Sequence, residues 1–262
     1  MDHKLSDDIV VYTEYDAAPP HPGHEWTRII CISDTHSRPL RVPLGDVLLH
    51  AGDLTAWGYP EQLQAIAAWL QTLPHPFKIV IGGNHDLGLD PEITESLFPN
   101  DQDVQETCNL YKSDAMHEKG VYYLEHDFLR LKLPSGRTWT IYGSPSAPRY
   151  ASGAFQYTNS EEAKRIYDRI PDDVDILLTH TPPHGVLDLT RKGKRAGCPS
   201  LAERLKALSS CKLHVFGHIH EAFGAQFVPN GSGKRLAVNA AVARSGSRPV
   251  IVDIKSAMSS VE

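Results

Sequence analysis

Histidine, aspartate and asparagine side chains recur in five short motifs spread along the chain. The motifs are, in order, Asp34-Thr-His36, Gly52-Asp53, Gly83-Asn84-His85-Asp86, Thr179-His180 and Gly217-His218-Ile-His220. Apart from Asp86 and the further imidazole of His85, they supply two carboxylates, one amide oxygen and four imidazoles. Oxygen and nitrogen donors without a thiolate suit Mn²⁺, Zn²⁺, Fe or Co²⁺. The set therefore predicts a two-metal centre for metal-assisted hydrolysis, with Mn²⁺ as the first choice of metal.

The spacing within the motifs suggests how the ligands are shared between the two ions. Asp34 and His36 are two residues apart, so on an extended segment both side chains point the same way. Two such pairs, the second being His218 and His220, could hold one cation together with Asp53. The remaining donors could hold a second cation, with Asp53 bridging both.

One imidazole is left over when the ligands are counted. His85 follows Asn84 directly and is surplus to the ligand set, so we expect it to donate a proton to the leaving alkoxide. Asp86 is expected to orient His85, as carboxylates commonly do for imidazoles near metals. His85 and Asp86 are thus the predicted catalytic residues.

The charge of the chain limits its partners. The 262 residues include 26 Lys and Arg against 32 Asp and Glu, a net charge of −6. This gives no general attraction to a nucleic-acid polymer or an anionic membrane, so neither is expected as a partner. Two divalent ions, two carboxylates and a bridging hydroxide leave about +1 at the site, enough to draw in a small phosphorylated substrate. Nothing in the composition predicts the oligomeric state.

The cysteines and the N-terminus indicate the compartment. Four cysteines show no Cys-x-x-Cys spacing, which argues against a structural zinc site or a disulfide framework and favours a reducing compartment. Residues 1–8 are polar and contain no apolar signal core, and no run has the length of a membrane span. We expect a cytoplasmic protein.

Short apolar runs precede the motifs. Runs at residues 28–32, 47–49, 78–81, 175–179 and 213–216 suit strands that are buried on both faces. The motifs therefore fall where strands end, and ligands of open α/β sheets bind outside the carboxyl ends of strands. This placement strengthens the prediction of one metal centre built from distant segments.

The remaining pattern predicts helices, hairpins and one α/β domain. Helices are expected at 63–70, within 90–120, at 161–170 and after a Ser200-x-x-Glu203 capping box, and hairpins at 129–142 and 225–238. Residues 1–25 are expected to form an N-terminal extension with a possible short strand at Val10–Tyr12. Residues 26–254 should form a single domain, and residues 255–262 a C-terminal tail.

Taken together, the ordered motifs resemble a known superfamily. The patterns D-x-H, G-D-x-x-x-x-G (Gly52 to Gly58), G-N-H-D, T-H and G-H-x-H resemble the calcineurin-like metallophosphoesterases. Segments 31–37, 48–54, 197–198 and 214–221 resemble, more narrowly, the metallophosphoesterase-domain-containing subgroup, whose members are linked to cyclic-nucleotide phosphodiesterase activity. The likeness runs from about Trp26 to Ala241. It implies a four-layer α/β/β/α sandwich with two central mixed β-sheets and a dimetal site at the carboxyl ends of strands.

The resemblance also implies roles for the motif residues. The first metal would take Asp34, His36, Asp53 and His220, and the second Asp53, Asn84, His180 and His218. The expected reaction is hydrolysis of a phosphodiester of a small nucleotide-like substrate by a metal-bridging hydroxide, with His85 as general acid. A phosphomonoesterase or phosphoprotein phosphatase is the alternative within enzymes. A non-catalytic scaffold that keeps its metals for stability is the alternative outside them.

Several residues outside the ligand set are weaker candidates. Possible substrate contacts are Arg38, Ser144, Arg149, His184 and Cys198. His184 departs from the pattern of the resembled family, where no histidine is expected after the fourth motif. The basic run at 191–195 could grip a second phosphate, although a solvated loop is the preferred interpretation. His50 lies in an apolar run and is expected to be a hydrogen-bonded core imidazole.

Overall fold

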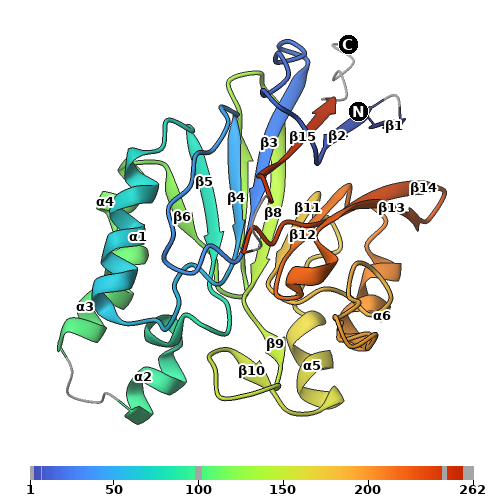
Figure 1. The fold of residues 1–262 in the computed structure, drawn as a ribbon. Helices are drawn as coiled ribbons and strands as arrows, with labels where there is room; N and C mark the ends of the chain where they lie inside the picture. Colours follow the sequence, from blue (N-terminus) through green and yellow to red (C-terminus); the bar gives the residue numbers. More distant parts are fainter. Residues whose placement is uncertain (1–2, 7, 98–101, 244–246, 256–262) are drawn as a thin grey trace.

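Two β-sheets lie face to face at the centre of the molecule, and helices cover their outer faces (Figure 1). The structure is a computed structural model that describes residues 3–6, 8–97, 102–243 and 247–255. The first sheet has the order β1-β2-β15-β3-β4-β5-β6, in which β3 to β6 are parallel. Its strands are β1 (His3–Ser6), β2 (Ile9–Tyr12), β15 (Val250–Lys255), β3 (Trp26–Ile32), β4 (Val47–Ala51), β5 (Phe77–Ile81) and β6 (Val121–Tyr123).

The second sheet has the order β13-β14-β12-β11-β8-β7, with the four central strands parallel. Its strands are β13 (Gly224–Asn230), β14 (Gly233–Asn239), β12 (Leu213–Phe216), β11 (Ile176–Thr179), β8 (Thr138–Ser144) and β7 (Asp127–Lys132). The hairpins predicted at 129–142 and 225–238 are confirmed as β7–β8 and β13–β14. A short parallel pair, β9 (Ala147–Pro148) and β10 (Gln156–Tyr157), lies outside both sheets.

Helices form the two outer layers. The helices are α1 (Pro60–Thr72), α2 (Pro91–Leu97), α3 (Gln102–Tyr111), α4 (Asp114–Glu118), α5 (Ser160–Tyr167) and α6 (Pro199–Ala207), with 3₁₀ turns η1 (Leu87–Leu89) and η2 (His220–Ala222). The apolar faces of α1, α3 and α4 pack on the first sheet, and those of α5 and α6 on the second. The predicted α/β/β/α sandwich is therefore confirmed. Among the described helices, none is both long enough and apolar enough for a membrane crossing.

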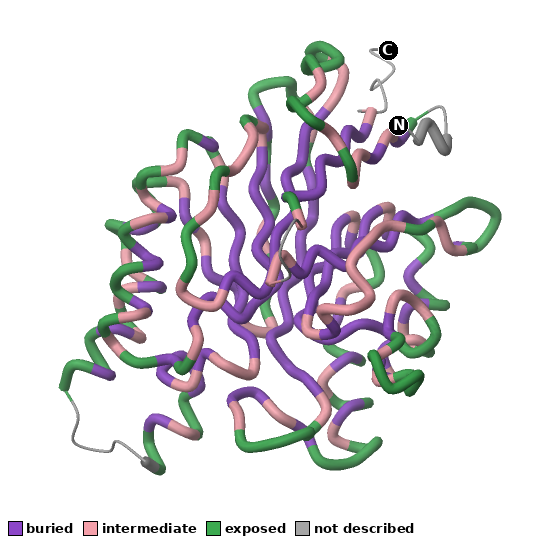
Figure 2. The backbone as a smooth tube through the Cα atoms, in the orientation of Figure 1, coloured by how far each residue is buried: buried purple, intermediate pink, exposed green. Residues whose placement is uncertain are grey.

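The apolar runs of the sequence form the centre of both sheets, as expected. In β3, Ile29 and Cys31 pack between the sheets, whereas Ile30 and Ile32 pack under the helices. All four side chains are fully buried, which explains why the run is apolar without alternation. Figure 2 shows this burial along the central strands of both sheets.

Local details differ from the expected ones at three points. The short strand predicted at Val10–Tyr12 is present as β2, and it pairs with β15, so it extends the first sheet. Helix α5 ends at Tyr167, and Ile170 is buried beyond its end. Helix α6 begins at Pro199, and its N-cap is Cys198, whose Sγ accepts a hydrogen bond from the Leu201 N–H. The predicted capping box at Ser200 is therefore wrong, because Ser200 already lies inside the helix.

Candidate metal centre

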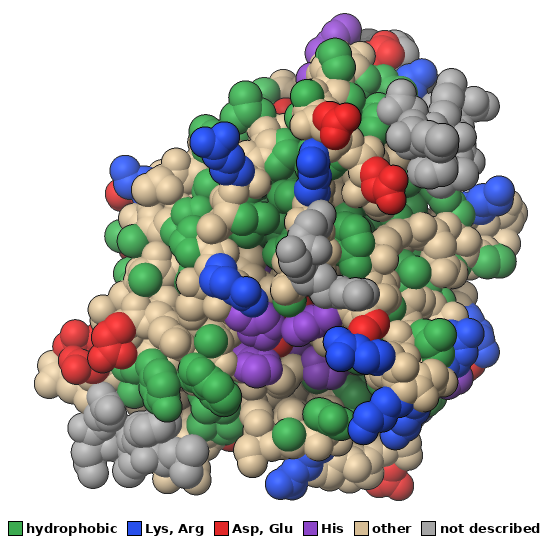
Figure 3. Space-filling view, viewed as in Figure 1, with side chains coloured by type: hydrophobic (Ala, Val, Ile, Leu, Met, Phe, Trp, Pro, Cys, Tyr) green, Lys and Arg blue, Asp and Glu red, His purple; other side chains and the backbone are tan. Residues whose placement is uncertain are grey.

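All five motifs lie directly beyond the carboxyl ends of parallel strands, on both sheets. The first sheet contributes the loops after β3, β4 and β5, and the second sheet contributes the loops after β11 and β12. The loops carry, in that order, Asp34 and His36, Asp53, Asn84 and His85, His180, and His218 and His220. Because the two sheets face each other, these ends meet at one edge of the sandwich. Figure 3 shows the resulting group of histidines on the surface, with Lys and Arg side chains on both sides of it.

The backbone of these loops is not extended, contrary to expectation. Asp34, His36, Asp53 and His218 have φ of 57°, 47°, 52° and 66°, in the left-handed region that non-glycine residues rarely adopt. Asp34 and His36 thus converge because the chain turns sharply, and not because alternate residues of a strand share a face. Backbone hydrogen bonds from Asp34 to Gly52 and from His36 to Asp53 hold the two loops together.

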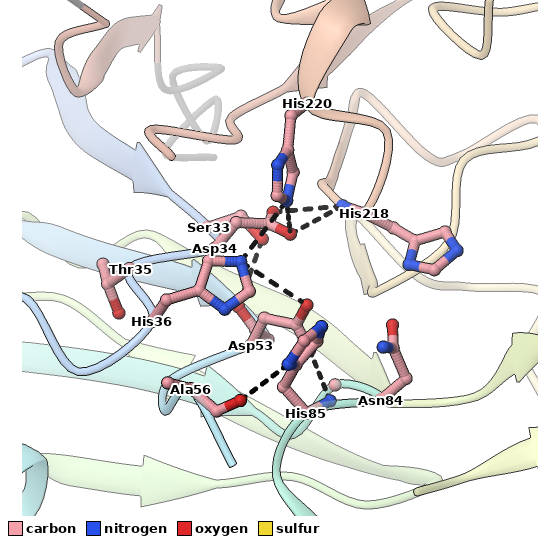
Figure 4. A network of polar contacts seen from close by, with 12 residues as sticks. Ser33, Asp34, Thr35, His36, Asp53, Ala56, Asn84, His85, His218 and His220 are labelled. Carbon is pink, nitrogen blue, oxygen red and sulfur yellow. Dashed lines mark hydrogen bonds and ion pairs between the residues drawn. The ribbon is translucent and has the colours of Figure 1, made fainter. Parts of the chain in front are cut away.

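Four side chains form a tight cluster of donor atoms. Ligand atoms of Asp34, His36, Asp53 and His220 all lie within 4.8 Å of one another. His220 Nε2 lies 3.0 Å from Asp34 Oδ1 and 3.4 Å from His36 Nε2 (Figure 4). These are the four residues that the family resemblance assigns to the first metal, whereas the spacing within the motifs grouped His218 with them.

The residues predicted for the second metal lie beside this cluster. His180 Nε2 is 3.0 Å from Asn84 Oδ1 and 3.3 Å from Asp53 Oδ1, so Asp53 faces both groups. The His180 Nδ1–H donates to the Ala51 carbonyl at 2.9 Å, which leaves Nε2 as the atom that faces the site. The ring of His218 lies 5.0 Å from that of His180, and its backbone N–H donates to the Asp34 carboxylate at 3.0 Å.

The charges of the site favour ionised carboxylates. Burial alone would raise the pKa of Asp53, but the neighbouring His180 outweighs it, and the pKa is well below its ordinary value. The pKa of Asp34 is also lowered, because the hydrogen bond from His220 and the charge of His180 outweigh burial. Conversely, burial opposes protonation of His180, yet Asp53 and Asp34 raise its pKa to about 9. The site is therefore built to hold positive charge against two carboxylates.

The donor set fits a pair of divalent metal ions. Two imidazole nitrogens that face each other at 3.4 Å beside a carboxylate need a cation or a proton between them, because both otherwise present lone pairs. Burial and the neighbouring His180 lower the pKa of His218 to about 4, so its ring is neutral, whereas His180, with its raised pKa, would have to release a proton to bind a metal. Asp34, His36, Asp53 and His220 could hold one ion, and Asp53, Asn84, His180 and His218 the other.

Glycines of the motifs make room for the neighbouring ligands. A Cβ atom on Gly217 would lie 2.0 Å from Asp34 Oδ2, and one on Gly83 would lie 2.4 Å from Asp53 Oδ1. Both distances are far shorter than any contact that real Cβ atoms make. Each glycine therefore leaves the space that a carboxylate of another motif occupies.

His85 lies at the rim of the cluster and is oriented by a backbone group. Its Nδ1–H donates to the Ala56 carbonyl at 2.7 Å, and its backbone N–H donates to Asp53 Oδ1 at 2.9 Å (Figure 4). Its ring lies 4.7 Å from that of His36, at an interplanar angle of 79°. Because a carbonyl can only accept, Nδ1 carries a proton and Nε2 is the nitrogen left to exchange protons. No sequence pattern could identify Ala56, since its contribution is a main-chain oxygen.

The expectation that Asp86 orients His85 is wrong. The Asp86 carboxylate is fully buried and accepts hydrogen bonds from the N–H groups of Leu54, Thr55 and Gly83 and from the Thr55 hydroxyl. It therefore ties the loop after β4 to the loop after β5. Burial and the charge of Asp53 raise the pKa of Asp86 to about 6 in spite of these donors.

The predicted substrate contacts are scattered around the centre. Ser144 ends β8, where its buried hydroxyl meets His126 Nδ1 at 3.3 Å. Cys198 is also buried, as the N-cap of α6. Arg38 and His184 are exposed, and Arg149 is exposed on the wall of a cavity of about 640 Å³. The structure thus brings none of the five into the donor cluster.

The other two candidates have simpler explanations. His50 is fully buried and its Nε2 meets the Thr35 hydroxyl at 2.9 Å, as expected for a core imidazole. In the basic run, Arg191 is 85% exposed and lies 3.7 Å from Glu221, whereas Arg195 pairs with the buried Asp188 at 2.8 Å. The run is thus a surface loop whose ends are tied down by acidic residues.

Known proteins are similar to this chain in sequence. It is 37% identical to metallophosphoesterase domain-containing protein 1 of Homo sapiens and of Mus musculus, over 236 residues that cover 89% of this chain and 71% of each relative. A solved dimetal phosphatase from Danio rerio aligns over 86% of this chain and 91% of its own, with a TM-score of 0.48 and 11% identity. A family model described as calcineurin-like phosphoesterase matches residues 27–222, and the chain therefore belongs to that family.

Proposed function

We propose that this protein hydrolyses a phosphodiester of a small, nucleotide-like molecule at a two-metal centre. The observation that carries the proposal is the donor cluster of Asp34, His36, Asp53 and His220, with the oriented imidazole of His85 beside it. A metal site that served stability alone would have no use for an additional imidazole held at the rim by a main-chain carbonyl. Manganese is the proposed metal, with Fe, Zn or Co as alternatives of similar ligand preference.

The residues of the chain divide the work between binding and proton transfer. When bound, the two metal ions would lower the pKa of a water molecule and neutralise charge on the phosphoryl oxygens. Asp53 faces both donor groups and is the proposed shared ligand. His85 keeps Nδ1 bonded to Ala56, so a proton for the leaving oxygen comes from Nε2.

The test compares hydrolysis of bis-p-nitrophenyl phosphate by the wild type and by Asp53→Ala, in the presence of Mn²⁺. We expect activity in the wild type and its loss in the variant, since neither ion can keep its full ligand set. Equal rates in the two proteins would contradict the proposal. A parallel panel of monoesters, diesters and phosphopeptides decides which ester class is preferred, and higher turnover of monoesters would replace the diesterase part of the proposal.

His85→Ala tests the proton donor separately. We expect bound metal to remain while turnover falls about 10²–10⁴-fold, as is usual for loss of a general acid. The loss should be larger for poor leaving groups, because they need the proton more. A rate near that of the wild type, with metal content measured on the same sample, would remove His85 from the mechanism.

A further inference from the structure

A tryptophan side chain stands exposed beside the proposed proton donor. Trp57 lies on the loop after β4, four residues beyond Asp53, and it is 60% exposed. Its ring centroid lies 6.0 Å from that of His85, at an interplanar angle of 55°. Tyr59, on the same loop, is 55% exposed. Figure 3 shows hydrophobic side chains directly beside the group of histidines, which is where a ligand-binding surface is expected.

The loop under Trp57 is fixed on both sides. The Ala56 N–H donates to Ser37 Oγ at 3.0 Å, and the Trp57 N–H donates to Gln62 Oε1 at 3.0 Å. The next residue, Gly58, has a φ of 71°, and a Cβ atom there would lie 2.1 Å from the Leu87 nitrogen. The main chain is therefore packed and bonded around an indole ring that itself points into solvent.

The same loop also fixes the position of His85. The Ala56 carbonyl accepts from His85 Nδ1, so the residue that holds the proton donor is bonded directly to the one that carries the indole. The backbone thus holds the two residues in neighbouring positions. This arrangement places Trp57 next to the proposed proton donor.

We propose that Trp57 is the binding platform for a planar aromatic group on the leaving alcohol, an inference that rests on the proposed role of His85. During hydrolysis, water adds to phosphorus, the bond to the leaving oxygen breaks, and that oxygen takes the proton from His85. The group attached to this oxygen is therefore on the His85 side, next to Trp57. Aromatic rings pair at centroid separations of about 4.5–7 Å, which the open space over Trp57 allows. The substrate class is a phosphodiester whose leaving alcohol carries an aromatic ring, such as a nucleobase.

The experiment uses two methyl phosphodiesters whose leaving groups have similar acidity but different shape. One carries a phenyl group and the other a hexafluoroisopropyl group, and both are assayed with the wild type, Trp57→Ala and Trp57→Phe. Stacking of one ring on an aromatic side chain predicts a loss of about tenfold in kcat/KM for the phenyl ester with Trp57→Ala, mainly through KM. For the hexafluoroisopropyl ester, which has no ring to stack, kcat/KM should change less than about twofold in Trp57→Ala. Trp57→Phe should retain most of the activity toward the phenyl ester.

A control and a binding measurement complete the test. Leu44 is 71% exposed and precedes the amino end of β4, away from the motifs. Leu44→Ala should therefore hydrolyse both esters with the kcat/KM of the wild type. Titration with phenyl phosphate should quench the tryptophan fluorescence of the wild type and not that of Trp57→Phe.

The outcomes separate the two proposals. Absence of hydrolysis of both esters by the wild type would overturn the proposed function. Hydrolysis that Trp57→Ala leaves unchanged, or reduces equally for both esters, would overturn the platform alone. Quenching that persists in Trp57→Phe would also overturn it.

Discussion

Replacement of Asp53 by asparagine should separate metal binding from folding. Asp53 Oδ1 lies 3.3 Å from His180 Nε2, and Oδ2 lies 3.9 Å from His36 Nε2, so this carboxylate faces a member of each proposed ligand set. Asparagine keeps the shape of the side chain but removes the negative charge. Both metal sites should therefore weaken together in Asp53→Asn.

The magnitude follows from linkage between binding and folding. A ligand that binds only the folded state at a free concentration of 100 times its Kd stabilises that state by about 2.7 kcal/mol. For a chain of 262 residues, about 2–4 °C in Tm corresponds to each kcal/mol. Mn²⁺ at this concentration should raise the Tm of the wild type by about 5–10 °C, whereas the rise in Asp53→Asn should be below about 2 °C.

The assay is thermal unfolding of chelator-treated protein, with and without added Mn²⁺. Asp188→Asn is the matched control, because Asp188 is also fully buried and accepts hydrogen bonds from Gly185, Gly197 and Arg195 outside the donor cluster. It should have a lower starting Tm but a normal rise with Mn²⁺. A full rise in Asp53→Asn would refute its role as the shared ligand, and no rise in the wild type would refute the metal centre.

Three further predictions concern the structure around the site. At pH 8, Asp86→Ala should lower the free energy of unfolding by about 3 kcal/mol, because three backbone donors lose their acceptor. Thr55→Val, which removes the hydroxyl donor to Asp86, should lower it by about 1 kcal/mol. Equal losses for the two variants in denaturant titrations would contradict the role of Asp86 in joining the loops after β4 and β5. Burial and then Arg169 lower the pKa of His126 from 6.5 to about 4. The contribution of the neutral ring to stability is therefore full above pH 6.5, and it falls by up to about 3 kcal/mol as the pH drops to 4. His126→Gln should reduce this pH dependence of the free energy of unfolding, and an unchanged dependence would contradict the assignment to His126. Arg28 pairs with Asp253 at 2.7 Å, and the two side chains are only 4% and 1% exposed. Arg28→Ala leaves a buried carboxylate without its partner and should lower the free energy of unfolding by about 3–5 kcal/mol. A loss under about 1 kcal/mol in the same denaturant titrations would show that the fold does not depend on this ion pair.

The sequence was informative where burial and topology act together. Strands covered on both faces must be apolar at every position, which is why runs such as 28–32 and 213–216 could be recognised as strands. Polar residues that directly follow such runs then have to gather at the carboxyl edge of the sheets. The meeting of the five motifs at one edge required no knowledge of loop conformation, whereas the specific set of Asp34, His36, Asp53 and His220 followed from the family resemblance and not from the spacing.

The details of the loops could not be predicted in the same way. His36 and His218 adopt positive φ. Histidine does so more often than most non-glycine residues, but still in only a small fraction of cases, so residue type alone could not predict the turn. Asp86 was expected to act on its sequence neighbour His85, but consecutive side chains diverge, and its partners include main-chain N–H groups 31 and 32 residues away. An exposed aromatic side chain has no periodic signature, so the place of Trp57 beside His85 could not be predicted from the sequence.

The strained loops have a consequence for the metal-free protein. Left-handed conformations cost about 1–3 kcal/mol for each non-glycine residue, and Asp34, His36, Ser37, Asp53 and His218 all adopt them. Hydrogen bonds that need no metal compensate for this cost. The N–H groups of Asp34, His36 and Ser37 donate to carbonyl groups of the loop after β4, and the His218 N–H donates to the Asp34 carboxylate. The last contact joins the two sheets directly. The ligand geometry is therefore organised by the sandwich itself, so removal of metal should lower the stability of the protein without unfolding the site.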